Sequence, residues 1–228
     1  MAVTFINSTQ RGLSAVSTWS IATHSSRHGG GALWLSVSAQ SSAVTVSGVS
    51  DDEGMTWSSG PSAVSAALAS SCAIETFYAL NISSNSSRVS GNWSGATSGA
   101  IMLLQFNGVS TANALRQVGS SIGGGSTTPS ASAITPSEDN MLLILDARSG
   151  LGTMNSTASV GWSSVGVISG EHHQYVIQGA ADSTDGRFSI ATAESAFGRV
   201  AVIASLSDTF VVSASVGKLH RLSMLGMT

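Results

Sequence analysis

Hydrophobic and polar residues alternate along most of the chain, which is the pattern of β-strands that bury one face. The alternating segments are rich in valine, isoleucine, threonine and aromatic residues. They predict strands over residues 2–6, 32–38, 43–49, 74–82, 87–94, 100–107, 141–147, 160–168, 173–180, 187–193, 198–206 and 209–216. A helical turn is expected only near 61–70 or 111–117. The pattern therefore predicts an all-β protein.

This many short strands favours two packed sheets, so we expect a β-sandwich of jelly-roll type. The expected domain is a single unit over residues 1–228, with an N-terminal segment 1–29, a long loop 119–139 and a C-terminal tail 217–228. Pro129 and Pro136 exclude a central strand from the long loop. The loop could be a linker between two domains. A crossing between the sheets of one sandwich is favoured, because neither half of the chain has a closed set of strands.

Charged residues are scarce and make up only 9% of the 228 residues, against roughly a quarter in an average soluble domain. The net charge is -3, and the nine basic residues are scattered singly. Such a chain lacks the basic stripe that neutralises phosphates, so nucleic-acid binding is disfavoured. An uncharged surface rich in hydroxyl groups is expected of a protein held in a large assembly or in an extracellular medium.

Two further features of the sequence bear on the cellular compartment in which the protein is made. Cys72 is the single cysteine, so neither a disulfide within the chain nor a cysteine metal cluster can form. The apolar runs IMLLQF and MLLILDA are too short to cross a membrane, and the first residues do not resemble a signal peptide. We expect synthesis in a cytoplasm without export. A phage particle, which is assembled in the host cytoplasm and released by lysis, would combine this with an extracellular type of surface.

Residues 50–57, SDDEGMTW, match the Asp-box pattern S-x-D-x-G-x-T-W. The matching residues are Ser50, Asp52, Gly54, Thr56 and Trp57. We expect a hairpin turn in which the Asp52 carboxylate accepts N–H groups of its own turn, Gly54 supplies a permissive backbone and Trp57 packs back on the next strand. Sialidase propellers carry several copies of this pattern, so a single copy in this chain favours a structural turn over glycan cleavage.

The run Asp51, Asp52 and Glu53 could alternatively hold a cation such as calcium. The acidic spacing of an EF-hand is missing, and the structural interpretation is favoured. Glu171, His172 and His173 suggest a zinc ligand set or a general base. Adjacent strand residues point to opposite faces, however, so the two imidazoles are not expected to bind one ion. We predict no catalytic residues, no metal site and no cofactor.

Four segments in succession resemble phage virion proteins and some bacterial surface proteins. The segments are SDDEGMTW, IETFYALNI, SSRVSGNWSGATSGAIMLLQFNGVSTANAL and TTPSASAITPSEDNMLLIL. An apolar strand ends in Phe106-Asn107-Gly108-Val109, and a loop with Thr128-Pro129-Ser130 precedes a strand that opens with Asn140-Met141-Leu142-Leu143. The resemblance covers roughly residues 30–205. It implies a β-sandwich or jelly-roll part of a capsid or tail, and it brings no catalytic residues.

The leading hypothesis is a non-enzymatic virion protein, namely a capsid decoration (cement) protein that stabilises the head through intersubunit contacts. Its expected partners are the major capsid protein or other virion proteins, and it is expected to be a homo-oligomer, with a trimer favoured, that contacts neither nucleic acid nor membrane. The apolar residues of the C-terminal tail are candidates for partner binding. They are Leu219, Leu222, Met224, Leu225 and Met227. The tail could equally fold back over one end of its own sandwich.

The alternative is a glycan-binding module of a phage tail or cell surface, with Trp57, Trp93 or Trp162 as stacking platforms. Two or more exposed, coplanar rings would favour it, and burial of these rings would count against it. A glycosidase is the third hypothesis. It requires two carboxylates about 5–10 Å apart across a cleft, and the twelve acidic residues show no clear pair.

Overall fold

The computed structural model describes residues 2–23, 31–66, 71–82, 85–111, 113–123, 130–136, 138–149, 160–168, 170–179, 183–184 and 199–207. The strands expected at 187–193 and 209–216 and the C-terminal tail 217–228 lie outside these ranges. None of the residues in these ranges is helical, so there is also no helix among them that could span a membrane. The prediction of an all-β protein is confirmed.

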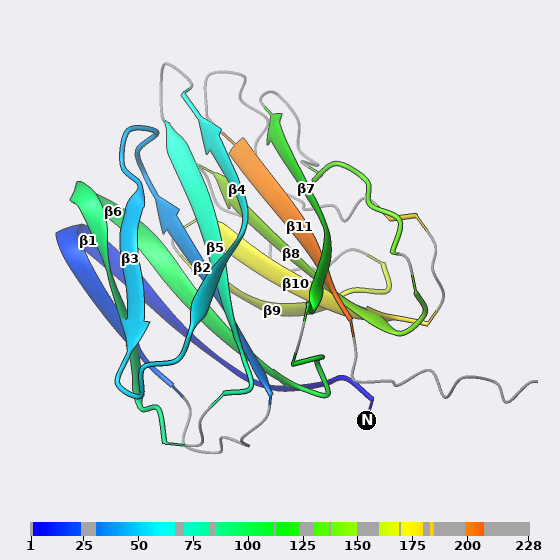
Figure 1. Cartoon of the computed structure of the whole chain (residues 1–228). Coiled ribbons are helices and arrows are strands. Elements are labelled where there is room, and N and C mark those ends of the chain that lie inside the picture. Colours follow the sequence, from blue (N-terminus) through cyan, green and yellow to red (C-terminus); the bar gives the residue numbers. More distant parts are fainter. Residues whose placement is uncertain are drawn as a thin grey trace, which may run out of the picture.

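Eleven strands are found in the described ranges (Figure 1). They are β1 (Thr4–Ala22), β2 (Ala32–Ala39), β3 (Val46–Asp51), β4 (Trp57–Ser65), β5 (Cys72–Leu80), β6 (Arg88–Asn107), β7 (Leu115–Gly123), β8 (Met141–Ser149), β9 (Ser163–Ile168), β10 (Glu171–Gln178) and β11 (Arg199–Leu206). Six of them form one sheet in the order β1-β6-β2-β5-β4, with β3 also paired to β6. The other five form a second sheet in the order β7-β11-β8-β10-β9. All pairs are antiparallel, and the arrangement is that of a β-sandwich.

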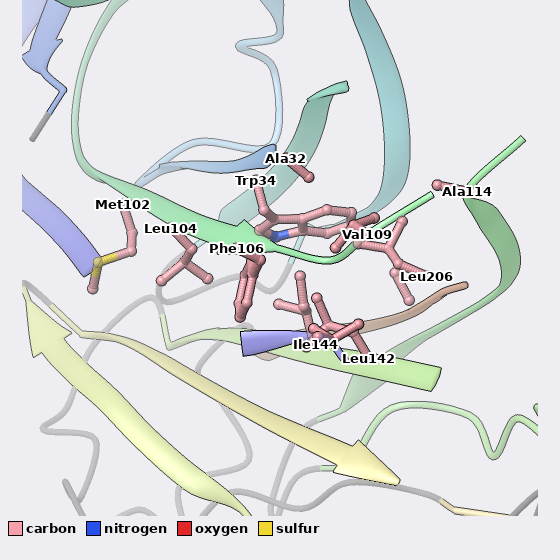
Figure 2. Close-up of a cluster of buried hydrophobic side chains, with 12 residues drawn as sticks. Ala32, Trp34, Met102, Leu104, Phe106, Val109, Ala114, Leu142, Ile144 and Leu206 are labelled. Carbon is pink, nitrogen blue, oxygen red and sulfur yellow. The ribbon is translucent and has the colours of Figure 1, made fainter. Parts of the chain in front are cut away.

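The main core lies between the two sheets. Figure 2 shows Trp34 of β2 and Phe106 of β6 facing Leu142 and Ile144 of β8, all of which are buried. Strands β2 and β8 are buried along their whole length, on both faces. Each sheet must therefore be covered on its outer side as well.

The outer side of the six-stranded sheet is covered by a fold in the sheet itself. Strands β1 and β6 have 19 and 20 residues, against a usual length of about 5–6, and Figure 1 shows them doubling back together. The side chain of Arg11 donates from Nη1 to the carbonyl oxygen of Ser20, nine residues further along β1, at 2.8 Å. A straight strand would separate these residues by about 30 Å, far beyond the reach of an arginine. The pairing irregularities between Leu13 and Thr18 mark the bend.

A second core fills the inside of this bend. Trp19 and Trp93, from the folded-back halves of β1 and β6, pack with Leu33 and Leu35 on the outer face of β2. Gly91 permits this packing, because a Cβ atom on it would lie 2.4 Å from Trp19 Cζ2. We name the folded-back layer, formed by β3 and the adjacent halves of β1 and β6, the flap.

The outer side of the five-stranded sheet is covered by part of the expected long loop. Ala131 and Ile134 pack on Leu143 and Leu145 of β8. Residues 119–123 belong to β7, so the expected loop is shorter than 119–139. The crossing between the sheets lies at 108–114, between β6 and β7, and not in the long loop.

Two local expectations are wrong. The helical turn expected near 61–70 is strand β4 up to Ser65, where Pro61 and Ala63 are buried and Ser62 and Val64 are exposed with a period of two. In the turn expected near 111–117, strand β7 begins at Leu115. Alanine and serine dominate the first segment, and the second, TANALRQ, has one large apolar residue, so neither shows a recognisable period. The N-terminal segment 1–29 is mostly β1, and the strands expected at 87–94 and 100–107 are the single strand β6.

Candidate functional site

The SDDEGMTW segment joins two strands that do not pair with each other. Strand β3 ends at Asp51 and pairs with β6 in the flap, whereas β4 begins at Trp57 and pairs with β5. The expected hairpin is therefore wrong, because the bend in the sheet places β3 in a different layer from β4. The segment is a connection between layers.

Asp51 performs the role that the Asp-box pattern assigns to Asp52. Its carboxylate accepts hydrogen bonds from the N–H groups of Glu53 at 2.7 Å and Met55 at 3.1 Å, and from Trp57 Nε1 at 2.8 Å. Gly54 has a φ of 70°, the left-handed conformation expected of it. Ser50 Oγ lies 3.5 Å from Ser90 Oγ on β6, and Thr56 is exposed.

Asp52 instead ties the segment to the start of β6. Its carboxylate accepts from the backbone N–H of Ser87 at 2.8 Å, from the Ser87 hydroxyl, and from the N–H of Arg88 at 3.2 Å. The Ser87 hydroxyl and N–H hold the pKa of Asp52 well below its usual range. Both aspartates thus accept hydrogen bonds from protein donors. Over the ranges that the structure describes, no group of three His, Cys, Asp or Glu side chains is placed to hold a metal ion.

Asp51→Ala is expected to lower the free energy of unfolding by about 1–2 kcal/mol, because three donors lose a charged acceptor at a partly exposed site. Glu53→Ala, two residues further along the same turn and exposed, is the matched control and should change the free energy by less than about 0.5 kcal/mol. Urea unfolding of the two variants measures the difference. Equal effects would show that Asp51 does not hold the turn.

A cluster of four titratable residues lies between the two sheets. The register of β8 and β10 places His173 beside Asp146 and Glu171 beside Arg148. All four side chains face the six-stranded sheet, and each residue is at most 1% exposed. We name Asp146, Arg148, Glu171 and His173 the buried quartet.

Hydrogen bonds join the buried quartet within the five-stranded sheet and across to β2. His173 Nδ1 lies 2.6 Å from Asp146 Oδ1, and Trp34 Nε1 donates to Asp146 Oδ2 at 2.8 Å. His173 Nε2 lies 3.2 Å from Glu171 Oε1, an ion-pair contact without the alignment of a hydrogen bond.

Two serines of β2 complete the connection. Ser36 and Ser38 donate from their hydroxyl groups to the two oxygens of Glu171, at 2.8 and 2.7 Å. Arg148 Nη1 donates to Ser38 Oγ at 3.1 Å. Polar groups of three strands, β2, β8 and β10, thus fix the two sheets against each other at one level of the core.

The charges of the buried quartet balance. Burial by itself lowers the pKa of His173, but the negative charges of Glu171 and Asp146 outweigh it and raise the pKa to about 10. His173 is therefore an imidazolium at neutral pH. Burial lowers the pKa of Arg148, and the charge of Glu171 opposes this shift. Two cations then face two carboxylates, which is the arrangement that makes buried charges tolerable.

His172 points to the opposite face of β10, as expected from the alternation of strand residues. Its Nε2 lies 2.9 Å from Ser164 Oγ of β9. Burial, and then the positive charge of His173, lower its pKa to about 4, so it is neutral at physiological pH. The two adjacent histidines therefore carry different charges and do not share a ligand.

A His–Asp pair beside a glutamate can perform acid–base chemistry only where a substrate can reach it. The buried quartet is sealed, since its four residues are at most 1% exposed. Two hollows of about 240 and 230 Å³ lie elsewhere on the surface, and none of the four lines either of them. The geometry is that of a structural polar cluster and not of an open active site.

The tryptophans proposed as glycan platforms are not exposed rings. Trp93 is buried at 4% exposure in the core under the flap. Trp57 and Trp162 are half-buried and pack against core clusters. The expected signature of two or more exposed rings is therefore missing from these three residues. The tail residues Leu219, Leu222, Met224, Leu225 and Met227 lie outside the described ranges.

Comparison with protein-family models, with curated proteins and with solved structures found no match for this chain.

Proposed function

We propose that this protein is a non-enzymatic structural protein of a phage particle, a capsid decoration protein that stabilises the head by contacts with the major capsid protein and with other copies of itself. The observation that carries the proposal is the sealed buried quartet. The chain has few charges, and four of those that could perform chemistry are used to fix one sheet against the other. Side chains used in this way stabilise the sandwich mechanically, and their burial does not favour catalysis on a substrate.

The surface composition supports the same proposal. Only 9% of the residues are charged, against roughly a quarter in an average soluble domain. Exposed strand positions such as Ser47, Ser62 and Thr18 carry hydroxyl groups instead. Uncharged hydroxyl groups can be buried in contacts between subunits without the cost of removing charges from water.

A glycan-binding module is the second candidate, and one hollow favours it. The hollow of about 230 Å³ is lined by Tyr78 and Leu80 together with the hydroxyl groups of Thr56, Ser58 and Thr111. An aromatic wall with a few polar groups is the usual composition of a small-ligand site. Its volume is below the roughly 300–1,000 Å³ of typical ligand pockets, which is why it stands second.

The test is assembly. Purified protein is mixed with phage heads that were assembled without it, and bound protein is measured after sedimentation of the heads. We expect the protein to bind the heads at a fixed ratio to the major capsid protein. We also expect the temperature at which the heads open to rise. A stable monomer that ignores the heads and is retained on a polysaccharide column would contradict the proposal and support the second candidate.

A further inference from the structure

The edges of the two sheets differ in how they are covered. The six-stranded sheet ends at β1 and β4, with β3 as a further edge in the flap, and the five-stranded sheet ends at β7 and β9. Strand β4 lies against β7 and β11, so the edges on that side of the sandwich cover each other. On the other side, the Gln10 side chain of β1 lies beside Gly166 of β9, but β1 pairs only with β6, and no strand of the described ranges pairs with its second edge.

The segment Asn7–Leu13 is the regular part of this edge. Its pairing with β6 runs from Asn7 opposite Gln105 to Leu13 opposite Gly99 without an irregularity. The N–H of Ser8 donates to Asn7 Oδ1 at 2.6 Å, so it points away from β6. Because backbone groups alternate in direction along a strand, the N–H and C=O groups of Gln10 and Gly12 point outward as well.

This edge lacks the usual protection against pairing. Natural edge strands carry lysine, proline, inward charges or bulges that prevent the addition of another strand. Asn7–Leu13 contains no proline and one charge, Arg11. The guanidinium of Arg11 is turned over the sheet toward Ser20 of the flap. Protection is confined to one end of the segment, where the Asn7 side chain engages the Ser8 N–H and a pairing irregularity lies between Phe5 and Asn7.

We infer that Asn7–Leu13 is an interface at which a second copy of this chain adds its own β1 in antiparallel orientation, with the two-fold axis at Gln10. An open edge requires an extended strand with free outward groups, and β1 itself is such a strand. Centring on Gln10 brings Ser8, Gln10 and Gly12 opposite outward-pointing residues of the partner. The Gln10 pair then has matched backbone donors and acceptors, and the Ser8–Gly12 pairs have them once the Ser8 N–H exchanges Asn7 Oδ1 for the partner's Gly12 carbonyl.

The side chains of this register are also compatible. Thr9 lies opposite the partner's Arg11 in a pair without backbone hydrogen bonds, where side chains approach most closely. The two Arg11 side chains, the only charges of the segment, are not opposite each other. Like charges directly opposite would be destabilising. The inference goes beyond the proposed function, because it concerns two copies in solution without any particle.

The proposed register can be tested by placing a charge at Thr9, opposite the partner's Arg11. Thr9→Lys places a positive charge opposite the partner's Arg11 twice in each dimer, and is expected to weaken the dimer about tenfold. Thr9→Glu places a negative charge there and is expected to strengthen it by a similar factor. Sedimentation velocity of the full chain over a range of concentrations measures both constants. Ser62→Lys and Ser62→Glu introduce the same charges at an exposed position of β4, another edge strand, and as controls they should leave the dimer unchanged.

The inference would be overturned if the chain stays a monomer at every concentration, or if both Thr9 variants change the dimer constant in the same direction. A trimer would also overturn it, because a trimer requires a head-to-tail contact. Amide hydrogen exchange of the unmodified chain tests it without any variant: the N–H groups of Gln10 and Gly12 should become protected as the concentration rises. Protection that does not depend on concentration would also overturn it.

The inference and the proposed function can fail separately. Self-association without binding to heads would leave the inference intact and remove the proposed function. Binding to heads by a monomer would support the proposed function and remove the inference.

Discussion

Asp146→Ala is expected to lower the free energy of unfolding by about 3–5 kcal/mol, the cost of removing one partner from a buried ion pair. The substitution leaves the His173 imidazolium with Glu171 as its one acidic neighbour in the buried quartet, and it leaves Trp34 Nε1 without its acceptor. Neither group can turn to water, because both residues are at most 1% exposed. Urea unfolding at neutral pH is the measurement.

The surface pair of Arg116 and Glu138 provides the matched control. Their charged atoms are 3.7 Å apart, and their side chains are 37% and 49% exposed. Glu138→Ala should therefore cost less than about 1 kcal/mol, because water replaces the lost partner. A cost for Asp146→Ala no greater than that for Glu138→Ala would show that the buried quartet does not hold the sheets together.

Raising the pH is expected to destabilise the protein through His173. Its pKa is raised from 6.5 in the unfolded chain to about 10 in the folded protein, so the folded protein holds a proton that the unfolded chain loses. The contribution is fully present below pH 6.5. It falls by at most about 1.4 kcal/mol per pH unit as the pH rises, and it is lost by about pH 10.

Chemical unfolding of the unmodified chain and of His173→Gln across this pH range tests the expectation. Tyrosine and lysine titrations are common to both proteins, so the difference between the two curves isolates His173. The variant should lack the downward slope between neutral and alkaline pH. Nitrogen NMR of the imidazole at pH 8 gives an independent answer if the variant does not fold, and a neutral ring would contradict the assignment of charge to His173.

The strands themselves could be predicted because valine and isoleucine alternate with serine and threonine. The bend could not. The sequence Gly95-Ala-Thr-Ser-Gly99 has the composition of a break between strands, yet β6 continues through it. Small residues are compatible with both a loop and a sharply bent strand, so the local sequence does not distinguish one long strand from two short ones.

The buried quartet was missed for a related reason. Asp146 and Arg148 end a strongly apolar run, and Ser36 and Ser38 alternate with Leu35 and Val37. Alternation shows which residues share a face, but it does not show whether that face meets water or another sheet. The signal that could have identified the cluster is that Asp146 and Arg148 share one face of a strand, as do Glu171 and His173.

In the SDDEGMTW segment the pattern predicted a turn and the position of its glycine, but not the partner of each carboxylate. Asp51 is outside the pattern and holds the turn, while Asp52 is inside it and binds residues 87 and 88. A pattern of this kind describes local backbone geometry. The distant partner depends on which strands the sheet brings together.

The order of strands also determines when the chain can fold. The first strand, β1, pairs along its whole length with β6, from Thr4 opposite Asn107 onward, and β11, the last described strand, lies between β7 and β8 in the interior of its sheet. Neither sheet can therefore close while the chain is still short on the ribosome, and the second must wait for residues 199–206. Contacts so distant in sequence make folding slow, so we expect the edges of β7 and β8 that pair with β11 to stay exposed until residues 199–206 have been synthesised.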